Sequence, residues 1–364
     1  MKVAVIGGGI NGVMSAWALR ARGHEVTLFE RGALMGATSS ASTKLLHGGL
    51  RYLEQGDIRQ VYEGLHERHW WMQHAPTLTR QVELFLPLYS HAPHGRLTIA
   101  VGLTAYDLLS GRTTLGRHRW WSANNLPARA AVLKRDGLRG TFSYFDAQMD
   151  DAALGRWAAD RALEDGVVIR EHTDVTHIAR DGELRTSDGA LQFDAIVNVA
   201  GPWARALLDA SGIPSHTQLD LVRGSHLVVN RPIEAGFALN LASDGRLVFA
   251  LPYHGRTLVG TTEVRQSLDD PIVCSAAERE YLLNAYNTFF VDQIHDTDVE
   301  SVFAGVRPLV DFGKSAHAQR RGETIEVEGR VVSVFGGKWT TSRVLGQKVA
   351  EVVGRLPQNR KDSA

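Results

Sequence analysis

The stretch that decides the fold runs from Lys2 to Glu30 and reads KVAVIGGGINGVMSAWALRARGHEVTLFE. The apolar residues before the glycines predict a short buried strand, and the apolar period after them predicts a helix that ends at Gly23. The following EVTLFE predicts a second strand with Glu30 at its end. This order of strand, glycine-rich turn, helix and strand is typical of an α/β fold.

Three glycines give the pattern G-x-G-x-x-G between the first strand and the helix. Gly7 permits the tight turn, Gly9 lets the backbone approach a pyrophosphate, and Gly12 lets the helix pack closely on the strand. The helix N-terminus then faces phosphate charge, and Glu30 can accept hydrogen bonds from both ribose hydroxyls. This context favours a bound dinucleotide over a glycine-rich turn without a ligand. The acid at Glu30 disfavours NADP, because it suits an unphosphorylated ribose.

Three later segments favour FAD over NAD as that dinucleotide. RGALMGATSSASTK (31–44) supplies hydroxyl and backbone N–H donors that can wrap the far side of a longer cofactor. DAIVNVAGPWA (194–204) predicts a third strand that runs into a loop near the cofactor. VVSVFGGKWTTSRVLGQKVAEVV (331–353) predicts a strand, a turn and a helix. The N-terminus of that helix would stabilise the electron-rich edge of a reduced flavin.

Length, charge and cysteine content exclude several classes of protein. A chain of 364 residues predicts about two domains. Its 40 basic and 40 acidic residues cancel, so no overall field attracts nucleic acid. The single cysteine, Cys274, excludes an intramolecular disulfide and any cysteine-built metal site, and it fits the cytoplasm. We expect no secretory signal, no membrane span, and a disordered tail at 357–364.

Three further segments predict local structure. DDAALGRWAADRALEDG (150–166) predicts a helix that is capped by Asp151 and ends at Gly166. HERHWWMQHA (66–75) predicts an amphipathic helix with a packed aromatic face rather than a metal site. RTTLGRHRWW (112–121) predicts a solvated face, with interfacial membrane contact as the alternative.

Ten blocks that span most of the chain carry a resemblance to a known family. In order along the chain they are ATSSASTKLLHGGLRYLE, HAPTLTRQVELFLPLY, GLTAYDLLSGRTTL, FSYFDAQMDDAAL, VNVAGPWA, DLVRGSHLVV, RLVFALPYHGRTLVGTTE, YLLNAYNTFF, FAGVRPLVD and SVFGGKWTTSRVLGQ. Together they resemble the FAD-dependent, aerobic-type glycerol-3-phosphate dehydrogenases, within the D-amino-acid-oxidase-like flavoprotein superfamily. The resemblance covers about 1–353.

The resemblance implies a Rossmann-like FAD-binding domain, interleaved with an α+β substrate domain that is built on an antiparallel sheet. The FAD-binding domain would comprise 1–75, 145–215 and 328–356, and the substrate domain would comprise 76–144 and 216–327. The family usually continues past the last helix into a C-terminal helical domain. We therefore expect a short form that lacks this domain, for which oligomeric state, membrane docking and quinone access stay open.

The resemblance implies oxidation of the C2 alcohol of sn-glycerol 3-phosphate to dihydroxyacetone phosphate, with hydride passing to flavin N5 and electrons passing on to quinone. It implies a place in glycerol metabolism and a cytoplasmic location, with peripheral contact at the inner face of the cell membrane as an option. Glu263 stands where the family usually has Asp, and Trp339 replaces the usual aliphatic residue. Two alternatives therefore stay open. One is an FAD-dependent oxidase or dehydrogenase of another anionic hydroxy compound, and the other is a flavin-binding subunit that needs a partner.

The family implies that SSASTKLLHGGLRY (39–52) lies along FAD and passes the flavin ring. Gly48 and Gly49 would let the backbone pack against the cofactor there. The backbone at Val175, in DVTHI (174–178), would meet adenine. We expect no metal. The residues expected to bind FAD, without a covalent bond, are Gly7, Gly9, Ile10, Asn11, Gly12, Glu30, Arg31, Thr38, Ser39, Ser40, Ser42, Thr43, Lys44, His47, Gly48, Gly49, Leu50, Val175, Ala200, Gly201, Trp203, Gly336, Gly337, Lys338, Trp339 and Thr340.

The small anionic substrate needs cations and a base. A phosphate group carries nearly two negative charges, and arginine binds it with two parallel hydrogen bonds. For the base we favour His226 in RGSH, because a near-neutral pKa suits proton abstraction, and His47 is the alternative. Lys338 contacts either the substrate or flavin N1 and O2. The residues expected to bind the substrate are Arg51, Tyr52, Arg307, Lys338, Thr340 and Thr341.

Overall fold

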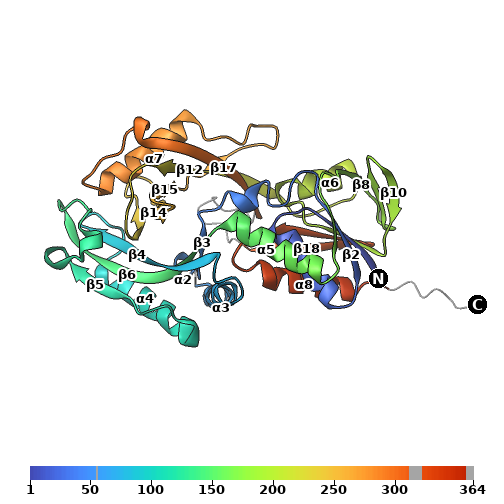
Figure 1. Cartoon of the computed structure of the whole chain (residues 1–364), viewed down its shortest axis with the longest axis horizontal. Coiled ribbons are helices and arrows are strands. Elements are labelled where there is room, and N and C mark those ends of the chain that lie inside the picture. The colour runs from blue at the N-terminus through green and yellow to red at the C-terminus, as the bar shows by residue number, and fades with distance from the viewer. Residues whose placement is uncertain (55, 311–321, 358–364) are drawn as a thin grey trace, which may run out of the picture.

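Two lobes, each built on one large sheet, lie side by side along the long axis of the molecule (Figure 1). The computed structural model describes residues 1–54, 56–310 and 322–357. Strands from distant parts of the chain alternate between the two sheets, as the mixture of colours in each lobe of Figure 1 shows. The expected tail lies, from residue 358 onward, outside the described residues.

The first lobe contains a six-stranded sheet whose strands are parallel except at one edge. In spatial order the strands are β18 (Glu323–Glu328), β19 (Val331–Gly336), β11 (Ala195–Asn198), β1 (Lys2–Ile6), β2 (Glu25–Phe29) and β7 (Val168–Arg170). The central strand β1 is buried on both faces, because Val3 and Val5 pack into one core and Ala4 and Ile6 into another. The predicted strand–helix–strand start is confirmed, with α1 (Ile10–Ala21) between β1 and β2.

Helices cover one face of this sheet, where α1 packs against α5 (Asp151–Glu164) and α8 (Ser342–Gly354). The approach of α1 and α8 is close, since a Cβ atom at Gly346 would lie 2.4 Å from the carbonyl oxygen of Met14. The predicted cap of α5 was wrong by one residue. The N-cap is Asp150, which accepts from the N–H of Ala153, whereas Asp151 is fully buried and binds elsewhere.

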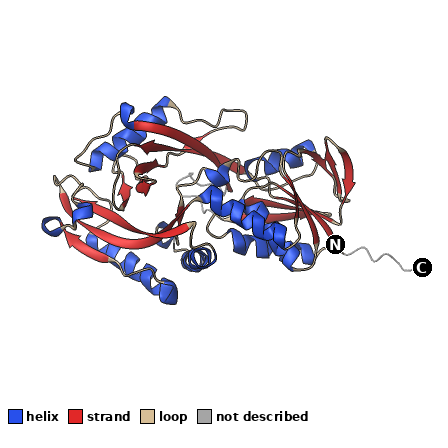
Figure 2. Ribbon diagram, viewed as in Figure 1, coloured by secondary structure: helices blue, strands red, loops and turns tan. Residues whose placement is uncertain are grey.

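The other face of the six-stranded sheet carries α6 and a small antiparallel sheet (Figures 1 and 2). The helix α6 spans Ala204–Ala210 and follows the short 3₁₀ turn Gly201–Trp203. The small sheet consists of β8 (Val175–Ile178), β9 (Glu183–Thr186) and β10 (Gly189–Gln192). The predicted third strand and the loop after it are therefore confirmed as β11 and this turn.

The second lobe is built on a ten-stranded, largely antiparallel sheet. Its strands are β3 (Leu45–Leu46), β4 (Thr79–Tyr89), β5 (Arg119–Ser122), β6 (Leu138–Met149), β12 (Leu219–Val229), β13 (Gly236–Asn240), β14 (Leu247–Tyr253), β15 (Arg256–Gly260), β16 (Val264–Arg265) and β17 (Val299–Val310). The sheet bends so that β12 and β17 lie above β4 and β6 in Figure 1. The predicted combination of a Rossmann-like domain and an antiparallel substrate domain is confirmed.

Four helices pack around the second sheet: α2 (Arg51–Glu54), α3 (Ile58–His74), α4 (Arg96–Ser110) and α7 (Ala276–Phe289). Shorter 3₁₀ turns lie at Thr38–Ser40, Gly111–Thr113, Ala123–Asn125, Ala128–Ala130 and Asp296–Asp298. We retain the predicted domain boundaries as a proposal with two adjustments. The segment 45–75, predicted within the FAD-binding domain, belongs with the second lobe, because it contains β3, α2 and α3. The boundary at 328 moves to Glu323, because β18 belongs to the six-stranded sheet.

The aromatic face predicted for 66–75 is confirmed in α3. Trp71 is fully buried and lies within 4.9–6.1 Å, between ring centroids, of Trp70, Trp157 and Trp339. Among the described residues, no group of histidine, cysteine, aspartate or glutamate could hold a metal ion. In the same part of the chain, no helix is long and apolar enough to cross a membrane.

The segment 112–121 is only partly the solvated face that its composition predicts. Its three arginines are exposed. The two tryptophans instead pack on β6, where Trp120 lies 4.8 Å from Phe142 and Trp121 donates to the hydroxyl of Ser143. The two tryptophans are therefore packed against the neighbouring strand β6, while the arginine side chains stay in contact with water.

A buried ion pair joins α3 to β6. Arg68, which is 1% exposed, donates to the carboxylate of Asp146 at 2.8 Å. The hydroxyl of Tyr106 on α4 donates to the same carboxylate and accepts the N–H of Gly48 at 2.9 Å. The pair therefore fixes two helices, one strand and the backbone of the 39–52 segment.

We expect Arg68→Met to lower the free energy of unfolding by about 3 kcal/mol, because it leaves the Asp146 carboxylate buried without its cation. Urea denaturation of the flavin-loaded protein measures this. Arg59→Met, on the exposed side of the same helix, is the control and changes stability by less than about 0.5 kcal/mol. Equal effects of the two substitutions would contradict the structural role given to Arg68.

Candidate active site

A cavity of about 650 Å³ lies between the two sheets and is lined by both lobes. The six-stranded lobe contributes the turn after β1, the end of β2, the loop after β11 and the turn before α8. The other lobe contributes β12 and β17. The cavity thus lies at the carboxyl ends of the parallel strands, where α/β sheets bind their ligands.

The turn after β1 accepts only glycine at two of its three predicted positions. Gly7 has a φ of +110°, and a Cβ atom at Gly12 would lie 1.9 Å from the carbonyl oxygen of Gly7. At Gly9 a Cβ atom would lie 3.0 Å from Oγ of Ser39, and that Oγ accepts the N–H of Ile10. The residues from Gly9 to Gly12 line the cavity at the start of α1, where the helix dipole favours negative charge.

The carboxylate of Glu30 is held at the end of β2 by the backbone. One oxygen accepts the N–H of Gly8 at 2.6 Å and the other accepts the N–H of Gly32 at 2.8 Å. A carboxylate accepts about four hydrogen bonds, so acceptor sites remain for the predicted ribose hydroxyls. Beyond it, the guanidinium of Arg31 lies 3.9 Å from the ring centroid of Trp203.

The 39–52 segment, which is predicted to pass the flavin, is fixed by buried contacts with Asp151. The ammonium of Lys44, which is 5% exposed, lies 2.5 Å from the carboxylate of Asp151 and donates to the carbonyl of Ser40. The N–H and hydroxyl of Ser42 donate to the other oxygen of Asp151. Lys44 therefore orders the backbone, and its charge is already paired.

The turn before α8 is hydrogen-bonded to the 39–52 segment. Trp339 donates from Nε1 to the carbonyl of Ser39 at 3.0 Å, and Thr340 accepts at its carbonyl from Trp71. The hydroxyl of Thr340 accepts the N–H of His47 at 3.4 Å. The large ring of Trp339 therefore closes one wall of the cavity.

His226 lies on β12, in the second lobe, and lines the cavity. Its Nε2 is 3.1 Å from Oγ1 of Thr43, and its ring stacks on Phe303 at 4.8 Å. Its Nδ1 is buried and has no hydrogen-bond partner among the described residues. In the same cavity wall, Nη2 of Arg307 donates to the carbonyl of Thr262 at 2.7 Å, and Nη1 lies 3.9 Å from the carboxylate of Glu263.

The expected near-neutral pKa of His226 was wrong. Burial, followed by the positive charges of Arg307 and Lys44, lowers the pKa of His226 to about 3. The imidazole is therefore neutral at physiological pH. It can accept a proton, although it binds that proton more weakly than a solvated histidine does.

Most of the predicted site residues line this one cavity. Those that line it are Gly7, Gly9, Ile10, Asn11, Gly12, Glu30, Arg31, Thr38, Ser39, Ser42, Thr43, His47, Gly48, Tyr52, Val175, Ala200, Gly201, Trp203, His226, Arg307, Gly336, Gly337, Lys338, Trp339, Thr340 and Thr341. Lys338 places its ammonium 3.9 Å from the ring centroid of Tyr52. Ser40, Lys44, Gly49 and Leu50 are not among the lining residues, and the side chain of Arg51 lies outside those described.

Sequence reasoning missed several lining residues in the second lobe, including Phe249, Thr261 and Gly305. Gly305 offered a signal, because it is a glycine within the strand-like FAGVRPL. A Cβ atom there would lie 2.7 Å from Cβ of Ala41, so the strand approaches the 39–52 segment closely. Phe249 and Thr261 carry no local signal, because only the pairing of β12, β14 and β15 brings them to the cavity.

These features fit FAD. Three glycines of the turn after β1 line the cavity with backbone alone, and the Glu30 carboxylate retains acceptor capacity beyond its two backbone hydrogen bonds. The turn at Gly336 and Gly337 has positive φ at both residues and leads into α8, whose N-terminus favours an electron-rich group.

The family described as FAD dependent oxidoreductase matches residues 2–352. The chain belongs to this family. The aerobic glycerol-3-phosphate dehydrogenase of Staphylococcus haemolyticus is 33% identical over 99% of this chain and 68% of its own length. The enzyme of the same name from Staphylococcus epidermidis is 31% identical over 97% of this chain and 67% of its own length. The resemblance carried by the ten blocks is confirmed, as is FAD as the cofactor of the family.

Solved structures give the same fold. The glycerol-3-phosphate dehydrogenase from Bacillus halodurans, complexed with FAD, is 25% identical with a TM-score of 0.78. That match covers 97% of this chain and 64% of the other. The L-α-glycerophosphate oxidase from Mycoplasma pneumoniae, with FAD bound, is similar in fold, with a TM-score of 0.78 at 16% identity over 97% of this chain and 94% of the other. The chain spans about two thirds of the length of the dehydrogenases it matches.

We expect Gly12→Ala to weaken FAD binding at least tenfold, or by about 1.4 kcal/mol, because the new methyl group displaces the Gly7 carbonyl from the turn. The ratio of flavin to protein after gel filtration measures this. Gly102→Ala, in α4 with open space around it, is the matched control and keeps the wild-type ratio. A Gly12→Ala protein that retained its flavin would contradict the role of this turn.

We expect His226 to make the protein acid-sensitive. The unfolded chain takes up this proton near pH 6.5, whereas the folded protein takes it up only near pH 3. The stability that this group contributes is therefore present above pH 6.5 and is lost, by about 1.4 kcal/mol per pH unit, as the pH falls from 6.5 toward 3. Urea denaturation at pH 7.5 and 5.5 should show a smaller acid loss in His226→Asn. The exposed His216→Asn should match the wild type, and an unchanged loss in His226→Asn would contradict the buried neutral state.

Proposed function

We propose that this chain is an FAD-dependent dehydrogenase that oxidises the C2 alcohol of sn-glycerol 3-phosphate to dihydroxyacetone phosphate. One observation carries the proposal. The buried His226 on β12 and Arg307 on the paired strand β17 line the same cavity. A base beside an anion-binding cation suits an alcohol that carries a phosphate group. The names of the relatives support the same substrate.

Bound FAD supplies the acceptor for the hydride that leaves C2. The glycine turn and the Glu30 carboxylate bind its pyrophosphate and ribose. The turn from Gly336 to Thr340 and the backbone at Gly48 bind the flavin end. Holding the cofactor on two lobes fixes the hydride acceptor against the substrate, which lowers the entropic part of the barrier.

The residues of the second lobe bind the substrate and move the proton. Arg307 binds the anionic or polar end of the substrate, and Lys338 adds positive charge from the opposite lobe. His226 accepts the hydroxyl proton at Nε2, the ring atom that faces Thr43. His47, on the cavity side of the 39–52 segment, remains the alternative base. Burial of His226 excludes water from the transfer.

Electron transfer to a quinone at the inner face of the cell membrane is also part of the proposal. Its support is an exposed apolar face on α4. Leu97, Val101 and Leu108 are 79%, 63% and 76% exposed and share one side of the helix. An exposed apolar helix face of this kind suits contact with a membrane surface.

A second candidate is oxidation of another anionic hydroxy compound. Two residues favour it. Trp339 narrows the cavity, and the Glu263 carboxylate lies 3.9 Å from Arg307, where it reduces the charge available to a dianion. This candidate predicts preference for a smaller or less charged substrate.

We expect anaerobic addition of sn-glycerol 3-phosphate to bleach the flavin absorbance of the purified protein. Arg307→Ala should lower the second-order rate of bleaching at least tenfold, since a hydrogen bond to a charged group contributes about 1.5–3 kcal/mol. Arg156→Ala, exposed on α5, is the control and keeps the wild-type rate. No bleaching of a protein with bound FAD would contradict this substrate, and bleaching by other hydroxy acids would then favour the second candidate.

A further inference from the structure

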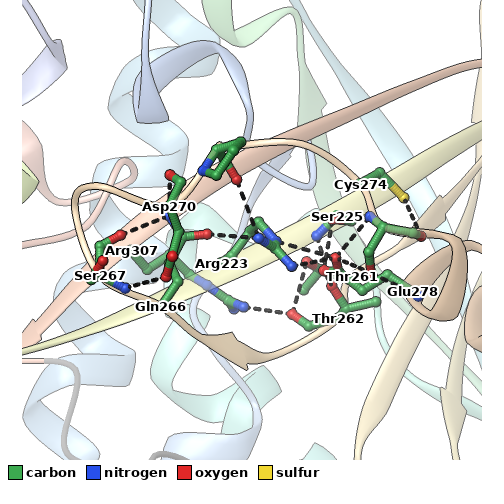
Figure 3. Close-up of polar contacts among 12 residues, drawn as sticks. Arg223, Ser225, Thr261, Thr262, Gln266, Ser267, Asp270, Cys274, Glu278 and Arg307 are labelled. Carbon is green, nitrogen blue, oxygen red and sulfur yellow. Dashed lines mark hydrogen bonds and ion pairs between the residues drawn. The ribbon is translucent and has the colours of Figure 1, made fainter.

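The guanidinium of Arg307 contacts a backbone carbonyl of the second lobe. Its Nη2 donates to the carbonyl oxygen of Thr262 at 2.7 Å. Thr262 is only 2% exposed and lies between β15 and β16, beside β12. Figure 3 shows the guanidinium of Arg307 directed at this carbonyl, so the position of the carbonyl helps to set the position of the guanidinium.

The strand β12 separates two polar groups of residues. Successive side chains of a strand point to opposite faces. Gly224 and His226 line the cavity, whereas Arg223 and Ser225 contact Glu278 at the start of α7. Glu278 is therefore outside the cavity, on the other face of the strand that carries the proposed base.

Glu278 collects a dense set of hydrogen bonds. Its Oε1 accepts the hydroxyls of Ser225 at 2.8 Å and Thr262 at 2.7 Å. Its Oε2 accepts both Nε and Nη2 of Arg223, and also the N–H and hydroxyl of Ser275. Burial alone would raise the pKa of Glu278, but the bonds from Ser275, Thr262, Arg223 and Ser225 outweigh it and lower the pKa to about 2. The carboxylate is thus permanently charged and fixed on both oxygens.

The Glu278 carboxylate fixes Thr262 through the hydroxyl of its side chain. The Thr262 hydroxyl donates to Glu278 and accepts the N–H of Ser225 at 2.8 Å. On its β12 side, Arg307 packs directly against the backbone of Gly224. A Cβ atom at Gly224 would lie 2.8 Å from Nη2 of Arg307 and 2.4 Å from the hydroxyl of Thr261. The chain of contacts from Glu278 to Thr262 to Arg307 is therefore short and tightly packed.

We propose that Glu278 is a positioning residue that sets the guanidinium of Arg307 through Thr262 and thereby determines the affinity for the anionic end of the substrate. This inference rests on the proposed function, in which Arg307 binds that end. Glu278 touches neither the cavity nor the proposed base, so its loss weakens substrate binding and leaves the chemical step nearly unchanged.

The test compares Glu278→Gln, Thr262→Val and Thr262→Ser in steady-state assays with an artificial dye as electron acceptor. Glu278→Gln and Thr262→Val should each raise KM for sn-glycerol 3-phosphate about fivefold or more, with kcat within about twofold. Thr262→Ser keeps the hydroxyl and should match the wild type. The double variant Glu278→Gln/Thr262→Val should raise KM no more than the more affected single variant does. Both substitutions disrupt the same hydrogen bond, between the Thr262 hydroxyl and Glu278. Glu280→Gln, exposed on the same helix, is the control.

An unchanged KM in a folded Glu278→Gln protein, or equal effects of Thr262→Val and Thr262→Ser, would overturn the inference. A parallel fall of kcat and flavin content would do the same, because it would indicate a purely structural role. If Glu278→Gln does not fold, the two Thr262 variants decide the question.

A second measurement separates this inference from the proposed function. Inorganic phosphate is titrated into each flavin-loaded protein, and the change in flavin absorbance gives its Kd. We expect the wild type to bind phosphate, and Glu278→Gln to bind it about fivefold more weakly. Wild-type phosphate binding without bleaching by glycerol 3-phosphate would contradict the proposed function alone. A wild type that bound neither ligand, or equal Kd values in both proteins, would overturn the inference.

Discussion

The buried ion pair between Lys44 and Asp151 is the constraint on which the arrangement of the two lobes depends. Lys44 lies where the chain leaves the six-stranded lobe to form β3, and Asp151 lies where it returns from β6 to α5. The carbonyl of Lys44 also accepts the N–H of Met149. One side-chain contact and one backbone contact therefore tie the outgoing and returning connections together at the edge of the cavity. An unpaired charge at this depth would be costly, so neither partner is free to leave.

The same pair shapes the chemistry of the site. The ammonium of Lys44 lies 4.9 Å from the ring centroid of Phe303, and Phe303 stacks on His226. With Arg307 it places positive charge around an imidazole that burial already keeps neutral. This charge distribution suits the anionic substrate that we propose and leaves the imidazole unprotonated. Lys44, which holds the two connections together, and Arg307, which we propose binds the substrate, thus both lower the pKa of His226.

The local parts of this structure could be predicted from sequence, because their causes are local. The close approach of Gly12 to the carbonyl oxygen of Gly7 involves only residues of one turn, and the apolar period sets α1 directly. The antiparallel sheet was predicted less directly. The order of the ten blocks indicated the family, and the family implied the sheet. Asp151 shows the limit of this reasoning. An acidic residue at the start of a helix predicts an N-cap. Asp151 instead pairs with Lys44, and Asp150 is the N-cap of α5.

The residues that line the cavity were more predictable than the residues behind them. The glycine pattern and the RGSH motif mark residues that line the cavity, but nothing local marks Glu278, which we propose acts from α7 across a strand. The pKa of His226 was missed for the same reason, because burial and the charges of Arg307 and Lys44 come from other segments. On β12 the two kinds of residue alternate: Gly224 and His226 face the cavity, and Arg223 and Ser225 face α7. A change on the hidden face of such a strand can therefore alter substrate binding without touching a single lining residue.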